Sequence, residues 1–213
     1  MSYKERVLSM HIGILGAGKL GTVLGRLAVA AGHDTTLASS GNPETIDLIV
    51  GTLVPGARTG TVQEVAAIAD VVILALPLRN FRQLPTDALA GKLVIDAMNY
   101  WWETDGHEPD LAEAHSSQLV QAHLNNSRVV KAFNHMGYHD LEEGPGTGKA
   151  IAVAGDNAED VTLVGTLVRD FGFEPLLLDS LKAGIALQPG YSAFGANVDA
   201  QTLHSLVDKK ELA

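Results

Sequence analysis

The stretch from residue 11 to residue 21, an apolar run that breaks into glycines, constrains the fold of this chain more than any other feature. Residues 12–15 carry no charge and suit a parallel strand that is covered on both faces. Gly16 and Gly18 then let the backbone turn tightly and approach a pyrophosphate, which any Cβ would push away. The stretch therefore predicts a dinucleotide-binding turn.

The residues after this turn predict a helix that ends at Gly32. Its apolar residues recur with the spacing of one helical face, and Gly21 lets the helix lie close to the strand. The free amides at its start, together with the positive end of the helix dipole, would face the pyrophosphate. The predicted contacts of the turn with the nucleotide are Gly16, Ala17, Gly18, Lys19 and Leu20.

The end of the second predicted strand, residues 34–38, bears on the choice of nucleotide. An acidic residue here would bind the ribose 2′-hydroxyl of NAD, whereas small polar or basic residues admit the 2′-phosphate of NADP. The chain has Ser39, Ser40 and Asn42, with no carboxylate among them, so NADP is favoured. Asn42 followed by Pro43 is also a good start for the next helix, and both interpretations can hold together.

Further apolar runs predict strands over residues 71–76, 93–97 and 129–133. Together with the turn they predict an α/β fold with a Rossmann-like, doubly wound, mostly parallel sheet and a small C-terminal α/β extension. A glycine-rich hinge divides the chain. We expect a dinucleotide-binding domain over residues 10–143 and a smaller part over residues 148–213, which packs on the domain and closes the substrate cleft.

The ends of the later strands meet at the carboxyl edge of such a sheet, where open α/β sheets bind ligands. For the nucleotide we expect further contacts from Leu76, Pro77, Leu78 and Asn99. For the substrate we expect contacts from Asn134, His135, Met136, Trp101 and Pro189. Plain core packing or a subunit contact is the alternative for Trp101, and aromatic residues serve these roles more often. His135 and His139 lack the sequence order of a zinc site, so no metal is expected.

The composition excludes several classes of function. The formal net charge of -10 argues against non-specific binding to nucleic acid or to an anionic membrane, so we expect small-molecule substrates. The chain has no cysteine, which removes disulfides and thiol catalysis and is compatible with a cytoplasmic enzyme. No uncharged apolar segment reaches the ~18 residues of a membrane span.

The sequence resembles the NADPH-dependent reductases of the deazaflavin coenzyme F-420. The order and spacing of several segments carry this resemblance, which extends over residues 10–194. The segments are residues 16–21, 32–45, 70–78, 89–92, 94–97, 131–134, 152–156 and 188–190. The chain departs from the family at Ser40-Gly41, where family members usually carry an arginine that binds the 2′-phosphate of NADP.

The resemblance implies direct hydride transfer between NADP(H) and coenzyme F-420, with the two flat rings stacked in one cleft. No side chain need shuttle a proton for the hydride itself, so no catalytic residue is required, and His135 is a weak candidate only. Another flat acceptor, such as a flavin or a ferric chelate, stays open, as does a nucleotide-binding sensor without turnover. Apolar residues near Trp101 and Phe194 make a homodimer a further hypothesis.

Overall fold

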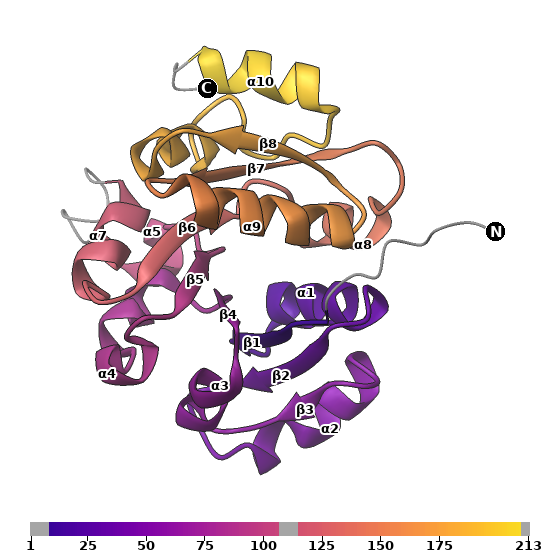
Figure 1. Cartoon of the computed structure of the whole chain (residues 1–213), viewed down its shortest axis with the longest axis vertical. Coiled ribbons are helices and arrows are strands. Elements are labelled where there is room, and N and C mark those ends of the chain that lie inside the picture. The colour runs from indigo at the N-terminus through magenta and orange to yellow at the C-terminus, as the bar shows by residue number, and fades with distance from the viewer. Residues whose placement is uncertain (1–8, 107–114, 210–213) are drawn as a thin grey trace.

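A computed structural model describes residues 9–106 and 115–209 of the chain. Its centre is an eight-stranded sheet with the order β3-β2-β1-β4-β5-β6-β7-β8, which runs from bottom to top in Figure 1. All neighbouring strands are parallel except β6 and β7. The strands are β1 (His11–Leu15), β2 (Asp34–Ala38), β3 (Arg58–Thr59), β4 (Val71–Leu74), β5 (Leu93–Asp96), β6 (Arg128–Ala132), β7 (Ala150–Gly155) and β8 (Glu174–Leu178).

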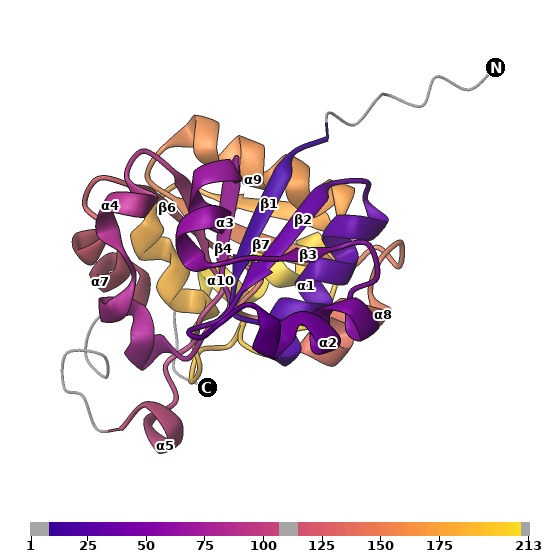
Figure 2. The ribbon, with the colours of Figure 1, turned by 90° about the horizontal axis from the view of Figure 1, so that it is seen from below.

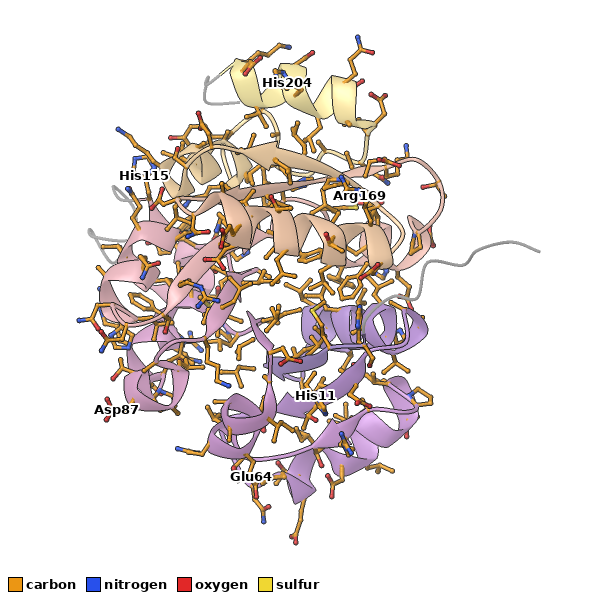
Figure 3. All side chains as sticks on the ribbon, viewed as in Figure 1. His11, Glu64, Asp87, His115, Arg169 and His204 are labelled. Carbon is orange, nitrogen blue, oxygen red and sulfur yellow. The ribbon has the colours of Figure 1, made fainter. Side chains whose placement is uncertain are left out.

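Helices cover both faces of this sheet, so the central strands are buried on both sides (Figure 2). One face carries α1 (Lys19–Ala30), α2 (Glu44–Leu53), α8 (Tyr138–Glu143) and α9 (Ala158–Asp170). The other face carries α3 (Val62–Ile68), η1 (Leu78–Gln83), α4 (Thr86–Leu89) and α7 (Ser116–His123). Side chains fill the space between the sheet and both helical layers (Figure 3). This arrangement confirms the predicted Rossmann-like α/β class.

The C-terminal part extends the same sheet. Strand β7 turns back antiparallel to β6, and β8 pairs parallel with β7. Along β7, Ile151 and Val153 join the core beneath α9, while Ala150 and Ala152 lie in the core beneath η2 (Leu181–Leu187) and α10 (Ala200–Asp208). The alternation of large and small residues therefore places a helical layer on each face of this strand.

The structure corrects some predicted boundaries. Strand β4 ends at Leu74 rather than at Leu76, and the chain bends at Leu76, directly before Pro77. The helix expected to start after Asn42 is α2, which begins at Glu44 and ends at Leu53. Helices α5 (Trp102–Asp105) and α3 are not among the predicted elements. None of these helices is long and apolar enough to cross a bilayer, within the described ranges.

Candidate functional site

The turn between β1 and α1 depends on two glycines that are held against the backbone. Gly16 has a φ of 124°, and a Cβ on it would lie 2.1 Å from the carbonyl oxygen of Ala75. A Cβ on Gly21 would lie 1.8 Å from the carbonyl oxygen of Gly16. A larger residue at Gly16 would push away the backbone that follows β4, and one at Gly21 would push α1 away from the turn, so glycine is required at both positions for the fold itself.

Gly18 has a different environment, because a Cβ added to it would meet no protein atom within 4 Å. It is the N-cap of α1, and the first turn of α1 holds no acidic residue and no side-chain cap within the described chain. The amides of this first turn donate to no side-chain cap in the described residues, so they remain able to donate to an anion. This arrangement fits a pyrophosphate that lies directly over Gly18.

A cavity of about 570 Å³ opens beside this helix start, at the carboxyl ends of β1, β2 and β4. Among the residues predicted for the nucleotide, it is lined by Gly16, Ala17, Gly18, Ser39, Ser40, Leu76 and Pro77. None of its lining residues, which all belong to the described 9–106 segment, carries a charge. The position and volume suit the adenosine and pyrophosphate portion of a dinucleotide.

Five of the predicted nucleotide contacts do not line this cavity. Lys19 and Leu20 continue into α1, and the amide oxygen of Asn42 accepts from the backbone N–H of Glu44 (3.1 Å) at the start of α2. Leu78 is completely buried in the core beneath the sheet, which argues against a side-chain contact with a ligand. Asn99 lies farther along the edge, after β5. Arg58, on β3, does not line the cavity either.

Some of the residues that line the cavity are not among the contacts predicted from the sequence. Thr61, Val62 and Gln63 enter the cavity from the start of α3, and Asn80, Gln83, Leu84 and Pro85 enter it from η1 and the segment after it. A local signal for α3 existed, because Thr61 and Glu64 form a capping box. The N–H of Thr61 donates to the Glu64 carboxylate (2.8 Å) and lowers the pKa of that group. Glu64 lies at the outer side of α3 (Figure 3).

Two asparagines meet where β5 and β6 end. The amide nitrogen of Asn99 donates to the carbonyl oxygen of Asn134 (2.8 Å), and the amide nitrogen of Asn134 donates to the amide oxygen of Asn99 (2.9 Å). Asn134 also donates to the carbonyl oxygen of Leu187 (2.7 Å). We call Asn99 and Asn134 the amide pair. It joins the nucleotide half of the sheet to the C-terminal part, at the edge where a nicotinamide would extend from the cavity.

The loop over residues 188–195, which includes Pro189, reaches the same edge. The N–H of Gly195 donates to the carbonyl oxygen of His135 (2.7 Å), and the Phe194 ring meets the Trp101 ring edge to face, with 5.5 Å between centroids. Trp101 keeps 45% of its surface exposed. The contact between Trp101 and Phe194 lies within one chain, so these rings need no second subunit to pack.

His135 and Met136 do not face this edge. His135 is fully buried, and its Nε2 accepts from the backbone N–H of Ala152 (3.2 Å), so the neutral ring carries its proton on Nδ1. Met136 lies in the core beneath α1, α8 and α9. The expected contact of these two side chains with a substrate is therefore corrected. Phe133, with a φ of 64°, causes the change because it turns the chain after β6.

Burial lowers the pKa of His135 to about 4. In an unfolded chain this histidine binds its proton near pH 6.5, whereas in the folded chain it stays neutral down to about pH 4. The contribution of the neutral ring to the unfolding free energy is therefore complete above pH 6.5 and is lost as the pH falls toward 4. We expect this histidine to account for about 3 kcal/mol of the acid-dependent loss of unfolding free energy. Denaturant titrations of the wild type and of His135→Gln, which keeps an acceptor but binds no proton, measure the difference. A His135 ring resonance that titrates near pH 6.5 would contradict the expectation.

These features define the class of protein. A glycine turn between β1 and an uncapped helix, with a cavity at the carboxyl edge of a parallel sheet, is the dinucleotide-binding arrangement of NAD(P)-dependent oxidoreductases. Residues 11–100 match the family described as "NADP oxidoreductase coenzyme F420-dependent". The matched stretch is less than half of the chain and contains the glycine turn, both serines and Asn99. It indicates NAD(P) as the nucleotide and an oxidoreductase as the class of activity.

Known proteins share part of this sequence or its fold, and the chain spans about a third of the curated relative that it matches. A curated glycerol-3-phosphate dehydrogenase [NAD(P)+] from Trichlorobacter lovleyi is 36% identical over 101 residues, which cover 42% of this chain and 30% of that protein. A solved protein of unassigned function from Sinorhizobium meliloti shares the fold, with a TM-score of 0.79, 24% identity, and coverage of 91% of this chain and 97% of its own. A candidate F-420-dependent NADP reductase from Arthrobacter sp. FB24 has a TM-score of 0.70, 21% identity, and coverage of 83% and 87%.

Proposed function

We propose that this protein transfers a hydride between NADP(H) and a flat acceptor of the deazaflavin type, coenzyme F-420. The observation that carries the proposal is the family match over the nucleotide-binding half, because that half supplies the turn, the cavity and Asn99. Hydride transfer asks little of the side chains beyond placement, since the two rings supply the chemistry. The chain's own residues bind the nucleotide, orient both rings and exclude water.

The amide pair supports the nicotinamide end of this proposal. Asn99 is half-buried and lies next to the edge, and the amide oxygen of Asn134 is buried without a hydrogen-bond partner in the described residues. An amide can bind the carboxamide of a nicotinamide through complementary donor and acceptor groups. We therefore assign Asn99, the more exposed of the two, to the nicotinamide, and Asn134, which is buried, to holding the Asn99 side chain in place.

The aromatic contact supports the acceptor end. Trp101 follows β5 and Phe194 lies on the 188–195 loop, and the hydrogen bond from the N–H of Gly195 to the carbonyl oxygen of His135 holds that loop close to the end of β6. A partly exposed indole offers a large apolar face on which a flat ring can stack. Pro189, at the start of the same loop, is half-buried and closes the other side of the acceptor site in this proposal.

The first experiment identifies the acceptor. The purified protein is mixed with NADPH and oxidised F-420, and the loss of visible absorbance is followed, with NADH, a free flavin and a ferric chelate in parallel. Rapid reduction of F-420 is the expected result. Reduction of the flavin or the chelate alone would assign a different acceptor. Nucleotide binding without any turnover would contradict the enzyme assignment and leave a nucleotide sensor.

Trp101→Ala tests the acceptor site. Loss of a stacked aromatic contact is worth roughly 0.5–1.5 kcal/mol, so we expect the KM for the acceptor to rise about two- to tenfold while the Kd for NADPH is unchanged. Trp102→Ala is the matched control, because it removes an exposed indole and leaves the Trp101 ring on Phe194. Equal effects of the two substitutions on KM would remove Trp101 from the site.

We also propose that two copies of the chain form a homodimer. Leu48, Ile49 and Leu53 expose apolar surface on α2, away from the aromatic contact. The mass in solution at working concentration decides the matter, and a monomer mass would exclude the dimer.

A further inference from the structure

A buried ion pair lies directly behind the amide pair. Lys131 on β6 and Asp96 on β5 are register partners, their side chains are both fully buried, and Lys131 Nζ lies 3.4 Å from Asp96 Oδ2. Burying two charges costs about as much as their attraction returns, so such a pair is a poor source of stability by itself. Its place at the carboxyl ends of β5 and β6, a few residues before the amide pair, indicates another role.

The pair holds both polar groups of one peptide residue. Asp96 Oδ1 accepts from the N–H of Met98 (2.9 Å), and Lys131 Nζ donates to the carbonyl oxygen of Met98 (3.2 Å). The hydroxyl of Ser117 donates to Asp96 Oδ2 (2.6 Å) and fixes the carboxylate from the side of α7. Met98 directly precedes Asn99, so the ion pair sets where the Asn99 side chain begins.

On β6, the ion pair also lies close in sequence to Asn134, the second member of the amide pair. Lys131 lies three residues before Asn134, and the intervening Phe133 adopts a φ of 64°, which a bulky residue rarely does. The Phe133 ring is fully buried and packs on Phe171, with 5.5 Å between centroids. Packing of this kind holds a strained turn in place, and the turn directs Asn134 toward Asn99.

We propose that Lys131 and Asp96 form a positioning pair, which acts through Met98 to hold the amide pair in register with the nicotinamide. The proposal rests on the proposed hydride transfer. That reaction needs the reacting atoms about 3–3.5 Å apart and aligned, and a misplacement of about 1 Å can slow it roughly a hundredfold. Neither charged side chain reaches the open edge, so they act on the reaction only through the residues they hold.

The test variant is the double substitution Lys131→Met with Asp96→Asn, which leaves no unpaired charge in the core. Its matched control is Arg128→Met with Asp160→Asn, at the opposite end of β6, where Arg128 Nε bonds both carboxylate oxygens of Asp160 (3.0 and 2.9 Å). We expect kcat of the test variant to fall roughly ten- to hundredfold with an unchanged Kd for the nucleotide. The control retains its kcat. A test variant that loses only thermal stability would overturn the proposal.

A second arm does not depend on turnover. The side-chain amide resonances of Asn99 and Asn134 report their placement directly, and we expect them to shift or broaden in the test variant and to stay unchanged in the control. Unchanged amide resonances would overturn the positioning role, whatever the kinetics. A wild type that reduces no acceptor would instead refute the proposed function, while the resonances still decide the positioning role.

Asp96→Asn alone covers the case in which the double variant does not fold. It keeps an oxygen that can accept from the N–H of Met98, and it leaves Lys131, which donates to the carbonyl oxygen of Met98, in place. We expect a smaller fall in kcat than for the double variant, with smaller shifts of the same resonances. Wild-type kcat and wild-type resonances in this variant would count against the proposal.

Discussion

Replacing Gly18 by alanine will leave the fold intact and remove most of the affinity for the nucleotide. A Cβ at this position meets no protein atom within 4 Å, so the substitution adds no clash to the free protein. The new methyl group enters the space over the start of α1, where we propose that the pyrophosphate binds. Overpacking of this kind costs typically about 1–3 kcal/mol, so we expect the Kd to rise roughly ten- to hundredfold. Titration of NADPH fluorescence measures it.

Gly21→Ala is the opposite control. Its Cβ would lie 1.8 Å from a backbone oxygen of the protein, so the cost falls on folding rather than on the ligand. We expect its unfolding free energy to drop by about 1–3 kcal/mol, measured by denaturant titration, while Gly18→Ala unfolds like the wild type. If Gly18→Ala binds NADPH normally, the pyrophosphate does not lie over this turn.

Replacing Ser40 by arginine will increase the affinity for NADPH and leave that for NADH nearly unchanged. Ser40 is exposed at the mouth of the cavity, and the cavity lining holds no charge. A guanidinium group there can form charge-assisted hydrogen bonds with a 2′-phosphate, each worth roughly 1.5–3 kcal/mol. We expect the Kd for NADPH to fall about tenfold, measured beside NADH by fluorescence titration.

Two further variants make this result specific. Ser40→Gln adds a side chain that can donate a hydrogen bond but carries no charge, and it should reproduce little of the gain. Ser39→Asp places a carboxylate at the same end of β2, and we expect it to lower the affinity for NADPH relative to that for NADH. If Ser40→Arg changes neither affinity, the 2′-phosphate lies elsewhere, and Arg58→Gln then tests the nearest alternative on β3.

The nucleotide half was predictable because its signals are local. The apolar strand, the glycines and the helical spacing of residues 11–32 follow one another along the chain, and β1 and α1 lie where they indicate. The seven residues of α3 are too short for a clear periodic pattern, so only the capping box marked this helix. Asn80 and Gln83 reach the cavity through η1, a placement that depends on tertiary packing rather than on a local motif.

The end of β6 shows why the substrate side was harder to predict. The sequence places Asn134 and His135 together at the tip of a strand, but it does not reveal that the bulky Phe133 takes a positive φ. That turn directs Asn134 to Asn99 and sends His135 into the core. The Lys131 and Asp96 pair was missed for a similar reason, because strand pairing alone brings these distant residues together.

Transfer of a deuterium label tests the central claim most directly. NADPH that carries deuterium at both positions of C4 of the nicotinamide is mixed with oxidised F-420 and the protein, and the reduced deazaflavin is examined by mass spectrometry and NMR. Direct hydride transfer predicts that the label moves to C5 of the deazaflavin, with no hydrogen taken from solvent at that carbon. Reduction with solvent hydrogen at C5, or no reduction although NADPH binds, would contradict the account.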